Sequence, residues 1–322
     1  MHNFPLVEPP RRTSLLCGLV LIFHCAPGAR ADVLGDLAQS FAASEFQFQR
    51  QKSNVPFQPL AWLSTARYGS TDLRTFDGDR AGSFEQSTAS QAVLVPMLLG
   101  PRDLFLVGEW VSLTHFEADA AADHDLDVLS IAVPIGWMRQ TSDAWQVAVF
   151  VAPTAHRATD HGAPWYWETM GGVFFRYVPE GRWWWLFGAY ADVSPDEDFY
   201  IPYAGASFLI DERWTLSLVL PWPALLYAPT TDWLFRLGVT PAGTSWAIEP
   251  ERGTVALDTD AWNLGASAER RVWGNFWLRA EAGVSGFRGF GFIGSDWENP
   301  NADAGTSPYV TIGINFRPAG IQ

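Results

Sequence analysis

The ten residues PYVTIGINFR, Pro308–Arg317, lie close to the C-terminal end and alternate between two kinds of side chain. Successive side chains of an extended strand point to opposite faces. One face is therefore apolar and carries Val310, Ile312, Ile314 and Phe316. The other face is small or polar and carries Tyr309, Thr311, Gly313 and Asn315. A water-soluble sandwich would bury the apolar face in a core, whereas a membrane barrel would turn it toward lipid and turn the polar face into a lumen.

The first residues are typical of an export signal. Arg11 and Arg12 precede the uncharged apolar stretch Ser14–Ala26, and Ala29–Ala31 then provides small residues at the positions that a signal peptidase reads. We interpret residues 1–31 as a secretory signal peptide that is cleaved after Ala31. The apolar stretch is too short to be a membrane-spanning helix.

Composition after the predicted signal narrows the class of protein. Cys17 and Cys25 both fall inside the signal, so the exported chain has no disulfide and no thiolate metal site. Removing the three arginines of the signal and Glu8 lowers the basic count from 21 to 18 and the acidic count from 35 to 34, which leaves a net charge of −16. Such a chain is a poor partner for nucleic acid. Its 17 Trp and 22 Phe, without an apolar run of about 18 residues, favour an outer-membrane barrel.

Alternation recurs along the chain and predicts further strands with one apolar face. Clear examples are VLSIAVPIGW (128–137), WQVAVFVA (145–152), TLSLVL (215–220), DAWNLGASAER (260–270) and FWLRAEAGVS (276–285). Glu109 interrupts an apolar face in LFLVGEWVSL, and we interpret it as a bulge or as a strand near a rim.

The connections between these strands alternate in length. Short turns are predicted at Gln140–Asp143, Pro179–Gly181, Asp211–Glu212, Pro229–Asp232 and Trp273–Gly274. Longer acidic loops, rich in Gly and Pro, are predicted at 69–83, 118–125, 157–164, 194–199, 249–258 and 294–306. Tight periplasmic turns and long extracellular loops are the asymmetry of an outer-membrane barrel.

These patterns predict an all-β fold: a closed antiparallel transmembrane β-barrel of 12–14 strands that follows a cleaved signal peptide. The count is 14 if 213–221 and 223–228 are separate strands. Residues 32–55 are predicted as a periplasmic lead-in or short helix, 56–317 as the barrel, and 318–322 as a C-terminal tail. The predicted location is the bacterial outer membrane, with outer-membrane lipids, lipopolysaccharide and the barrel assembly machinery as partners.

Several segments resemble a bacterial outer-membrane β-barrel family that is known only as a domain of unknown function. They are YAGASFLIDERWTLSLVLPWPALLYAP (203–229), WLFRLGVTPAGTSW (233–246), AWNLGASAERRV (261–272), GFRGFGFIG (286–294) and PYVTIGINF (308–316). The resemblance is best over about 170–317. It implies the fold and the location, and it transfers no catalytic residue because the family has none assigned.

Polar side chains opposite the predicted lipid faces are expected to line the lumen. They are Arg236, Asn263, Glu269, Arg279, Glu281 and Asn315. Folding the chain at Trp273–Gly274 is expected to pair Ser267 with Arg279 and to place Glu269 diagonal to it. Such groups would either line a polar pore or cross-link into a plug.

Chemistry at histidine is the alternative that the sequence leaves open. A lipid-modifying acyl hydrolase or transferase would need a histidine beside a hydroxyl or carboxylate near the outer rim. Weak candidates are His115, His156 and His161, and no pattern fixes a triad, so no catalytic residue is assigned.

The acidic loops DHDLD (123–127) and DEDFY (196–200) resemble part of a calcium loop, but they lack its glycine and closing glutamate. No metal site and no cofactor is therefore predicted, and dinucleotide and phosphate-loop fingerprints are absent from the sequence. The predicted function is a non-catalytic channel or scaffold barrel for small polar solutes. The alternative is the lipid-modifying enzyme with a rim histidine.

Overall fold

A computed structural model describes residues 44, 46, 52–74, 80–118, 126–159, 164–194, 198–248, 255–293 and 303–318. The predicted signal peptide, most of the lead-in and residues 319–322 lie outside the described part. No helix in the described part is long and apolar enough to cross a membrane.

The described chain is built from strands. Their bounds are β1 Ala61–Arg74, β2 Arg80–Leu98, β3 Asp103–Ala118, β4 Leu126–Ala132, β5 Ile135–Gln140, β6 Trp145–Ala158, β7 Tyr166–Glu180, β8 Trp183–Val193, β9 Asp198–Leu209, β10 Trp214–Leu220, β11 Ala224–Tyr227, β12 Trp233–Ile248, β13 Val255–Trp273, β14 Phe276–Ile293, β15 Asp303–Ala304 and β16 Thr306–Phe316.

Two pairs of these strands, β4 with β5 and β15 with β16, each form one longer strand, so the sixteen segments make a barrel of 14 strands. β4 and β5 both pair with β3 and with β6, and they are separated only at Val133 and Pro134, because Pro134 has no N–H to continue the ladder. β15 and β16 lie end to end along β1. Residues 213–221 and 223–228, whose separation the sequence left open, contain the separate strands β10 and β11, which form an antiparallel pair.

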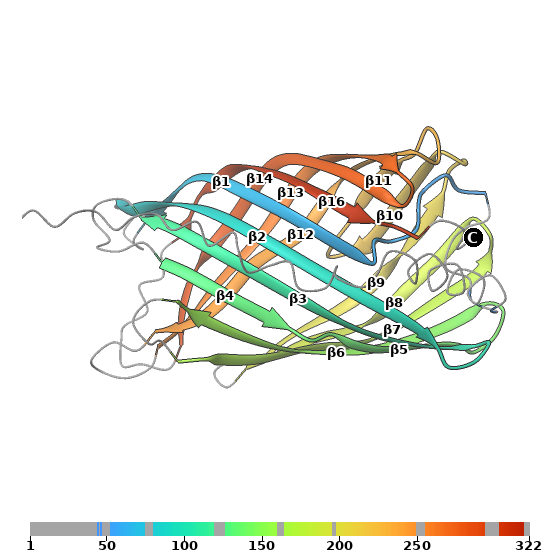
Figure 1. The fold of residues 1–322 in the computed structure, drawn as a ribbon, viewed down its shortest axis with the longest axis horizontal. Helices are drawn as coiled ribbons and strands as arrows, with labels where there is room; N and C mark the ends of the chain where they lie inside the picture. Colours follow the sequence, from blue (N-terminus) through green and yellow to red (C-terminus); the bar gives the residue numbers. More distant parts are fainter. Residues whose placement is uncertain are drawn as a thin grey trace, which may run out of the picture.

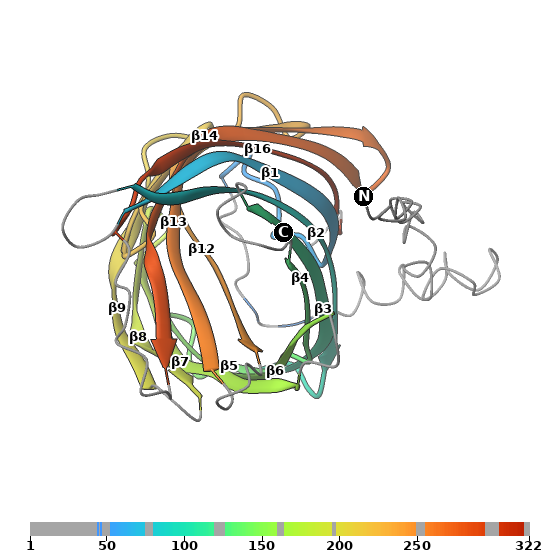
Figure 2. The same cartoon turned by 90° about the vertical axis from the view of Figure 1, so that its left-hand side faces the viewer.

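The barrel closes between its first and last strands (Figures 1 and 2). β1 pairs antiparallel with β2 on one side and with β16 on the other, with Ala61 opposite Phe316 and Tyr68 opposite Tyr309. Every other neighbouring pair is also antiparallel. This closure pairs the first and last strands of the sheet, so neither of them exposes a free edge to lipid.

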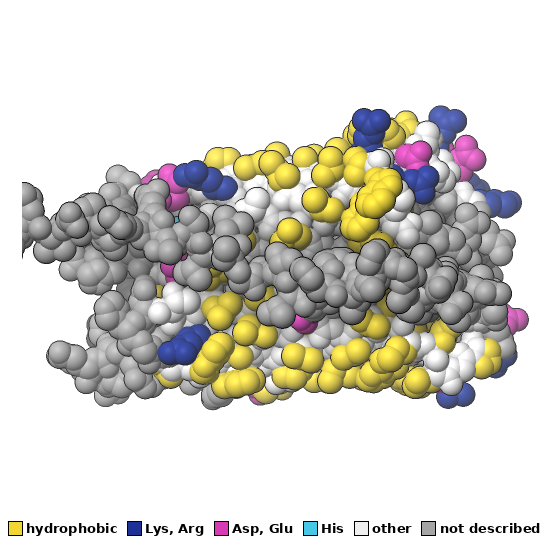
Figure 3. Space-filling model, viewed as in Figure 1, with side chains coloured by type: hydrophobic (Ala, Val, Ile, Leu, Met, Phe, Trp, Pro, Cys, Tyr) yellow, Lys and Arg dark blue, Asp and Glu magenta, His cyan; other side chains and the backbone are white. Residues whose placement is uncertain are grey.

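The outer surface carries an apolar belt (Figure 3). Along β16, Val310 is 47% exposed, Ile312 60% and Ile314 45%, while Tyr309 and Asn315 on the opposite face are buried. Phe316 is half-buried and its ring packs edge-on against Phe276, with centroids 5.5 Å apart. Exposed aromatic side chains gather near the short turns, among them Trp145, Trp183, Trp185 and Trp273. The closed sheet with an apolar exterior is the architecture of a transmembrane β-barrel.

The predicted short turns are placed as expected, whereas most residues of the predicted long loops lie outside the described part. The predicted loop 249–258 extends too far, because β13 already begins at Val255. Each predicted short turn joins two consecutive strands at the end where β1 begins, and Gly274 adopts a φ of 51° in the turn after β13. The prediction of a loop over 69–83 is wrong, because β1 continues to Arg74 and β2 begins at Arg80. These strand ends carry polar side chains on both faces, so the sequence shows no alternation of apolar and polar residues there.

Glu109 does not mark a bulge, so that alternative is wrong, while a strand near a rim stays a prediction. The register between β2 and β3 is continuous from Phe84 opposite Ala118 to Leu98 opposite Leu104. Glu109 lies on the outer face, where Gln91 Nε2 donates a hydrogen bond to its carboxylate at 3.4 Å. This contact gives the carboxylate a polar partner among apolar neighbours.

Candidate functional site

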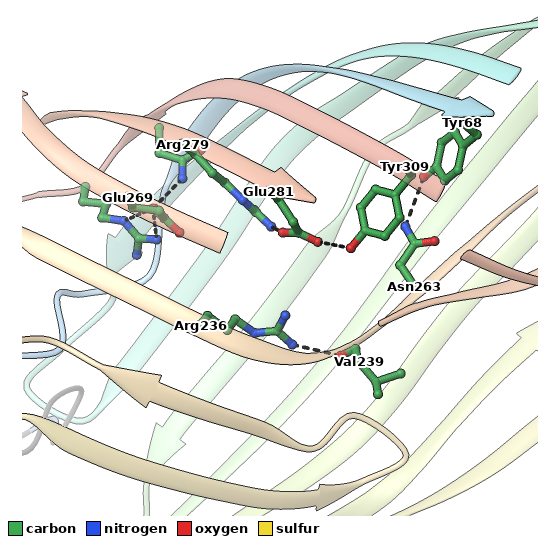
Figure 4. A network of polar contacts seen from close by, with 10 residues as sticks. Tyr68, Arg236, Val239, Asn263, Glu269, Arg279, Glu281 and Tyr309 are labelled. Carbon is green, nitrogen blue, oxygen red and sulfur yellow. Dashed lines mark hydrogen bonds and ion pairs between the residues drawn. The ribbon is translucent and has the colours of Figure 1, made fainter. Parts of the chain in front are cut away.

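The inner wall formed by β12, β13, β14, β16 and β1 holds a network of polar side chains, and Glu281 is its centre (Figure 4). Glu281 is only 5% exposed. Tyr309 Oη donates to Glu281 Oε1 at 2.5 Å, and Arg279 Nη2 forms an ion pair with Glu281 Oε2. Both carboxylate oxygens therefore have a partner, as a buried charge requires.

Tyr309 connects this centre to the seam where the barrel closes. The Tyr68 ring stacks on the Tyr309 ring with centroids 5.6 Å apart, and Asn263 Nδ2 donates to Tyr68 Oη at 3.1 Å. Gly265 lies beneath Tyr309, and a Cβ at this position would be 2.0 Å from Tyr309 Oη. The phenol can reach Glu281 only because position 265 has no side chain.

Glu269 organises a second group close to the end of the barrel where the C-terminus lies. Asn315 Nδ2 donates to Glu269 Oε2 at 2.8 Å, and Arg317 Nη2 approaches the same oxygen at 2.7 Å. Arg317 is 6% exposed, and its guanidinium lies 5.7 Å from the centre of the Trp277 ring. Arg317 Nη1 also donates to the carbonyl of Phe57. This buried pair thus joins β13, the end of β16 and the chain before β1.

The segment before β1 crosses the same end of the barrel. The Asn54 N–H donates to the Glu212 carbonyl at 2.7 Å, and its side-chain Nδ2 donates to the Ala228 carbonyl at 3.2 Å. Val55 packs against the cluster of Ala228, Leu234 and Trp277. Residues 52–60, which we call the strap, therefore form a floor under this part of the lumen.

The inner faces of β6, β7, β8 and β9 carry an aromatic cluster. Phe150 stacks on Phe174 with ring centroids 5.8 Å apart. Tyr203 meets Phe174 edge-on at 5.3 Å, and Tyr190 lies 6.4 Å from Phe150. We call Phe150, Phe174, Tyr190 and Tyr203 the aromatic wall. It offers apolar ring surface to the lumen.

The hydrogen-bonded wall is interrupted between β9 and β12, because β10 and β11 are short. β10 pairs with β9 only from Ala204 to Leu209, and β11 pairs with β12 only from Phe235 to Gly238. Among the described residues, 198–203 of β9 and 240–248 of β12 have no ladder partner on the side that faces the other strand. We call this interruption the gap. Tyr203 of the aromatic wall lies on its border.

Prolines border the gap on the three sides formed by described residues. Pro202 lies on β9, Pro241 on β12, and Pro221 and Pro223 in the turn between β10 and β11. Proline has no N–H, so it leaves fewer unpaired donors at a free edge and opposes pairing with another chain. Beyond the gap, β12 approaches β6 and β7 on the opposite wall, with Cα atoms within 8 Å (Figure 2). The two walls therefore come close together at this level.

The three histidine candidates have separate positions. His115 Nδ1 lies 2.7 Å from Asp127 Oδ1, and the His115 side chain is partly exposed. It faces outward, because the alternating residues Ser112, Thr114 and Phe116 are buried on the inner face. His161 lies outside the described residues. His156 is on the inner face, where its Nδ1 is 2.8 Å from Ser130 Oγ and its Nε2 is 2.8 Å from Glu168 Oε1.

The Ser130–His156–Glu168 arrangement has the residue types of a hydrolytic triad, but it is closed to substrate. Ser130 is 1% exposed and His156 is 2% exposed. A nucleophile must reach its substrate, so these contacts fit a buried cross-link between β4, β6 and β7. The acidic loops also lie largely outside the described residues. Asp127 contacts His115, and Asp198 accepts a hydrogen bond from Tyr200 Oη at 3.2 Å. The described residues contain no cluster of three or more potential metal ligands.

The structure places all six predicted lumen residues on the inner wall. Five of them belong to the two groups above, and Arg236 donates to the Val239 carbonyl at 2.8 Å. Sequence reasoning missed their partners Tyr68, Tyr309 and Arg317, and it missed Ser130 and Glu168. The aromatic wall was accessible in principle, because Phe150 alternates with Val149 and Val151, which were assigned to the apolar outer face. The expected pairing of Ser267 with Arg279 is wrong: Glu269 is opposite Arg279, and Ser267 is opposite Glu281. The register shifts between Arg271 and Trp273, which turn chemistry alone did not reveal.

Fold and outer belt together define a transmembrane β-barrel. No family model and no curated protein sequence matches the chain, so the resemblance to a particular barrel family has no support from these comparisons. Solved structures with a similar fold include an outer-membrane channel from Pseudomonas putida F1, with 9% identity, a TM-score of 0.48, and coverage of 84% of this chain and 99% of that one. A FadL homologue from Pseudomonas aeruginosa has 11% identity and a TM-score of 0.42, and the coverage is 86% and 97%. The translocator domain of the autotransporter NalP from Neisseria meningitidis has 9% identity and a TM-score of 0.37, and the coverage is 90% and 96%. Likenesses at this level carry no information about the solute of this chain.

Proposed function

We propose that this chain is a non-catalytic channel of the bacterial outer membrane that carries small, largely apolar molecules. The aromatic wall beside the gap is the observation that carries this proposal. Tyr203 lies on the border of the gap, and Phe174 and Phe150 continue the ring surface inward. A molecule in the outer half of the bilayer would meet these rings when it enters the lumen sideways.

We favour apolar over polar solutes because most polar groups of the inner wall already have a bonding partner. Most polar groups of the network are already bonded to one another, as in the pairs of Glu281 with Arg279 and Glu269 with Arg317. Such pairs stiffen a wall and do not offer a hydrated path. The strap covers part of the opposite end, which supports a sideways route over a wide aqueous pore.

Location and partners belong to the same proposal. The export signal predicted at residues 1–31 and the apolar belt support insertion in the outer membrane, with its lipids and lipopolysaccharide as surroundings. Phe316 near the chain end supports delivery by the barrel assembly machinery.

Two neighbouring phenylalanines on β7 provide the test. Phe174 faces the lumen, whereas Phe175 is 37% exposed on the outer face. We expect Phe174→Ala to reduce uptake of radiolabelled naphthalene by cells that express the barrel, while Phe175→Ala leaves uptake unchanged. Equal uptake by both variants and the parent protein, at equal amounts of folded barrel, would refute the proposal. Conductance in planar bilayers gives an independent check, since wide, steady ion openings would instead favour polar solutes.

A further inference from the structure

One arginine of the polar network has no carboxylate partner. The network contains three arginines and two glutamates on the inner wall. Arg279 pairs with Glu281 and Arg317 pairs with Glu269. Arg236 forms no ion pair with any described residue, and its recorded hydrogen bond runs from Nη2 to the Val239 carbonyl at 2.8 Å. The network therefore carries one uncompensated positive charge, and most of the Arg236 donors are unused (Figure 4).

Unbonded polar atoms lie beside this arginine. Ser267 is directly opposite Arg236 in the ladder between β12 and β13, and it is 6% exposed. Its Oγ has no hydrogen-bond partner among the described residues, and neither has Nε of Arg279, which lies on the next strand. Buried polar atoms in native proteins are rarely left without a partner, so these two buried donors, beside the N–H groups of Arg236 that have no recorded bond, indicate a missing acceptor.

We propose that Arg236, Ser267 and Arg279 form a subsite for the carboxylate of a small organic acid. This inference rests on the proposed function and names its substrate class. The acceptor is a monoanion, because one positive charge is uncompensated and a dianion would face Glu281 and Glu269 at close range. A planar carboxylate also matches the donor fork of a guanidinium.

The remainder of the ligand is apolar and compact. The strap floor meets Leu234, which lies two residues before Arg236 on the same inner face of β12. Only the short β10 and β11 separate β12 from β9 in the sheet, and the aromatic wall begins on β9 with Tyr203. An aromatic monocarboxylic acid fits both the aromatic wall and the subsite, because its ring lies against the aromatic wall and its carboxylate faces Arg236.

Binding to the purified full-length barrel in detergent tests the subsite, with 1-naphthoate and the neutral 1-naphthalenemethanol as matched probes in isothermal titration calorimetry. We expect the parent protein to bind the acid more tightly than the alcohol. Arg236→Gln should weaken binding of the acid by about tenfold to a hundredfold, because a hydrogen bond to a charged group contributes roughly 1.5–3 kcal/mol. Binding of the alcohol should not change. Ser267→Ala should weaken acid binding less, because it removes a neutral donor.

Arg213→Gln is the matched control, since Arg213 is exposed in the turn before β10. Heat-modifiable gel migration checks that each variant is folded. If the parent protein binds acid and alcohol equally, and Arg236→Gln alters neither, the subsite is refuted while the apolar channel stands. If neither probe binds, the proposed function fails together with the subsite. Loss of both probes in Arg236→Gln alone would also overturn the inference, because it would indicate a structural role.

Discussion

Tyr309 on β16 donates a 2.5 Å hydrogen bond to Glu281 on β14, and this bond passes directly above the Cα of Gly265 on β13. The bond joins the last strand of the barrel to the network inside it. The contact between three neighbouring strands, β13, β14 and β16, therefore depends on one small residue.

Gly265→Ala is expected to break this bond. The added Cβ would lie 2.0 Å from Tyr309 Oη and 3.0 Å from Glu281 Oε1, so the phenol must move away. Loss of a hydrogen bond to a charged group should lower the free energy of unfolding by about 1.5–3 kcal/mol, measured by urea unfolding in detergent. Gly181→Ala is the control, because a Cβ there meets no atom within 4 Å. Equal stability of the two variants would show that Tyr309 has another position open to it.

Arg317→Ala should destabilise the barrel and release the strap. The side chains of Arg317 and Glu269 are 6% and 5% exposed, and removing one partner of a buried pair costs about 3–5 kcal/mol. The Phe57 carbonyl loses its donor at the same time. We expect faster proteolysis near Lys52 and a lower unfolding midpoint. Arg213→Ala removes an exposed pair with Glu212 and should alter neither value measurably. Unchanged cleavage in Arg317→Ala would show that the other strap contacts suffice.

The turn between β10 and β11 should lie within the bilayer. β10 has seven residues, so at about 3.3 Å per residue and a tilt of about 40° it rises roughly 15 Å in an apolar band about 25 Å tall. A fluorophore on a cysteine at Trp222 should be quenched most by lipids brominated near the ends of their acyl chains. The same label at Gly181, in an exposed turn, should be quenched by aqueous iodide. Strong iodide quenching at position 222 would place the gap outside the membrane and remove the sideways route.

Surface labelling tests the orientation of the barrel. The predicted loops 157–164 and 294–306 contain Asp160 and Asn299, which lie outside the described residues. Cysteines at these two positions should react with a membrane-impermeant maleimide on intact cells, whereas a cysteine at Gly181 should not. Background is absent once the signal is removed, because Cys17 and Cys25 are the only cysteines. The reverse labelling pattern would invert the topology.

Much of the fold was readable from the sequence because a membrane barrel imposes a strict local rule. Lipid outside and lumen inside force an alternation of period two on each strand, and it was visible from Val310 to Phe316. The rule also assigned Arg236 and Glu281 to the inner wall. It failed where both faces are polar, as at the end of β1 and the start of β2, because alternation then has no contrast.

Which inner side chains meet could not be read in the same way. The pairing of Glu269 with Arg279 depends on a register shift near Arg271, and the contact of Glu269 with Arg317 joins residues 48 positions apart. Neither the register shift nor a contact over this separation can be read from the local sequence.

The sequence by itself determined most of the strands, the face of the side chains where the two faces differ in polarity, and the short turns, since these follow from hydrophobicity and the period of an extended chain. Tertiary structure alone decided the gap, the strap floor and the lone charge of Arg236. Each of these depends on where non-adjacent strands end relative to one another. The closure of the sheet fixes those positions, and the composition of any single strand does not.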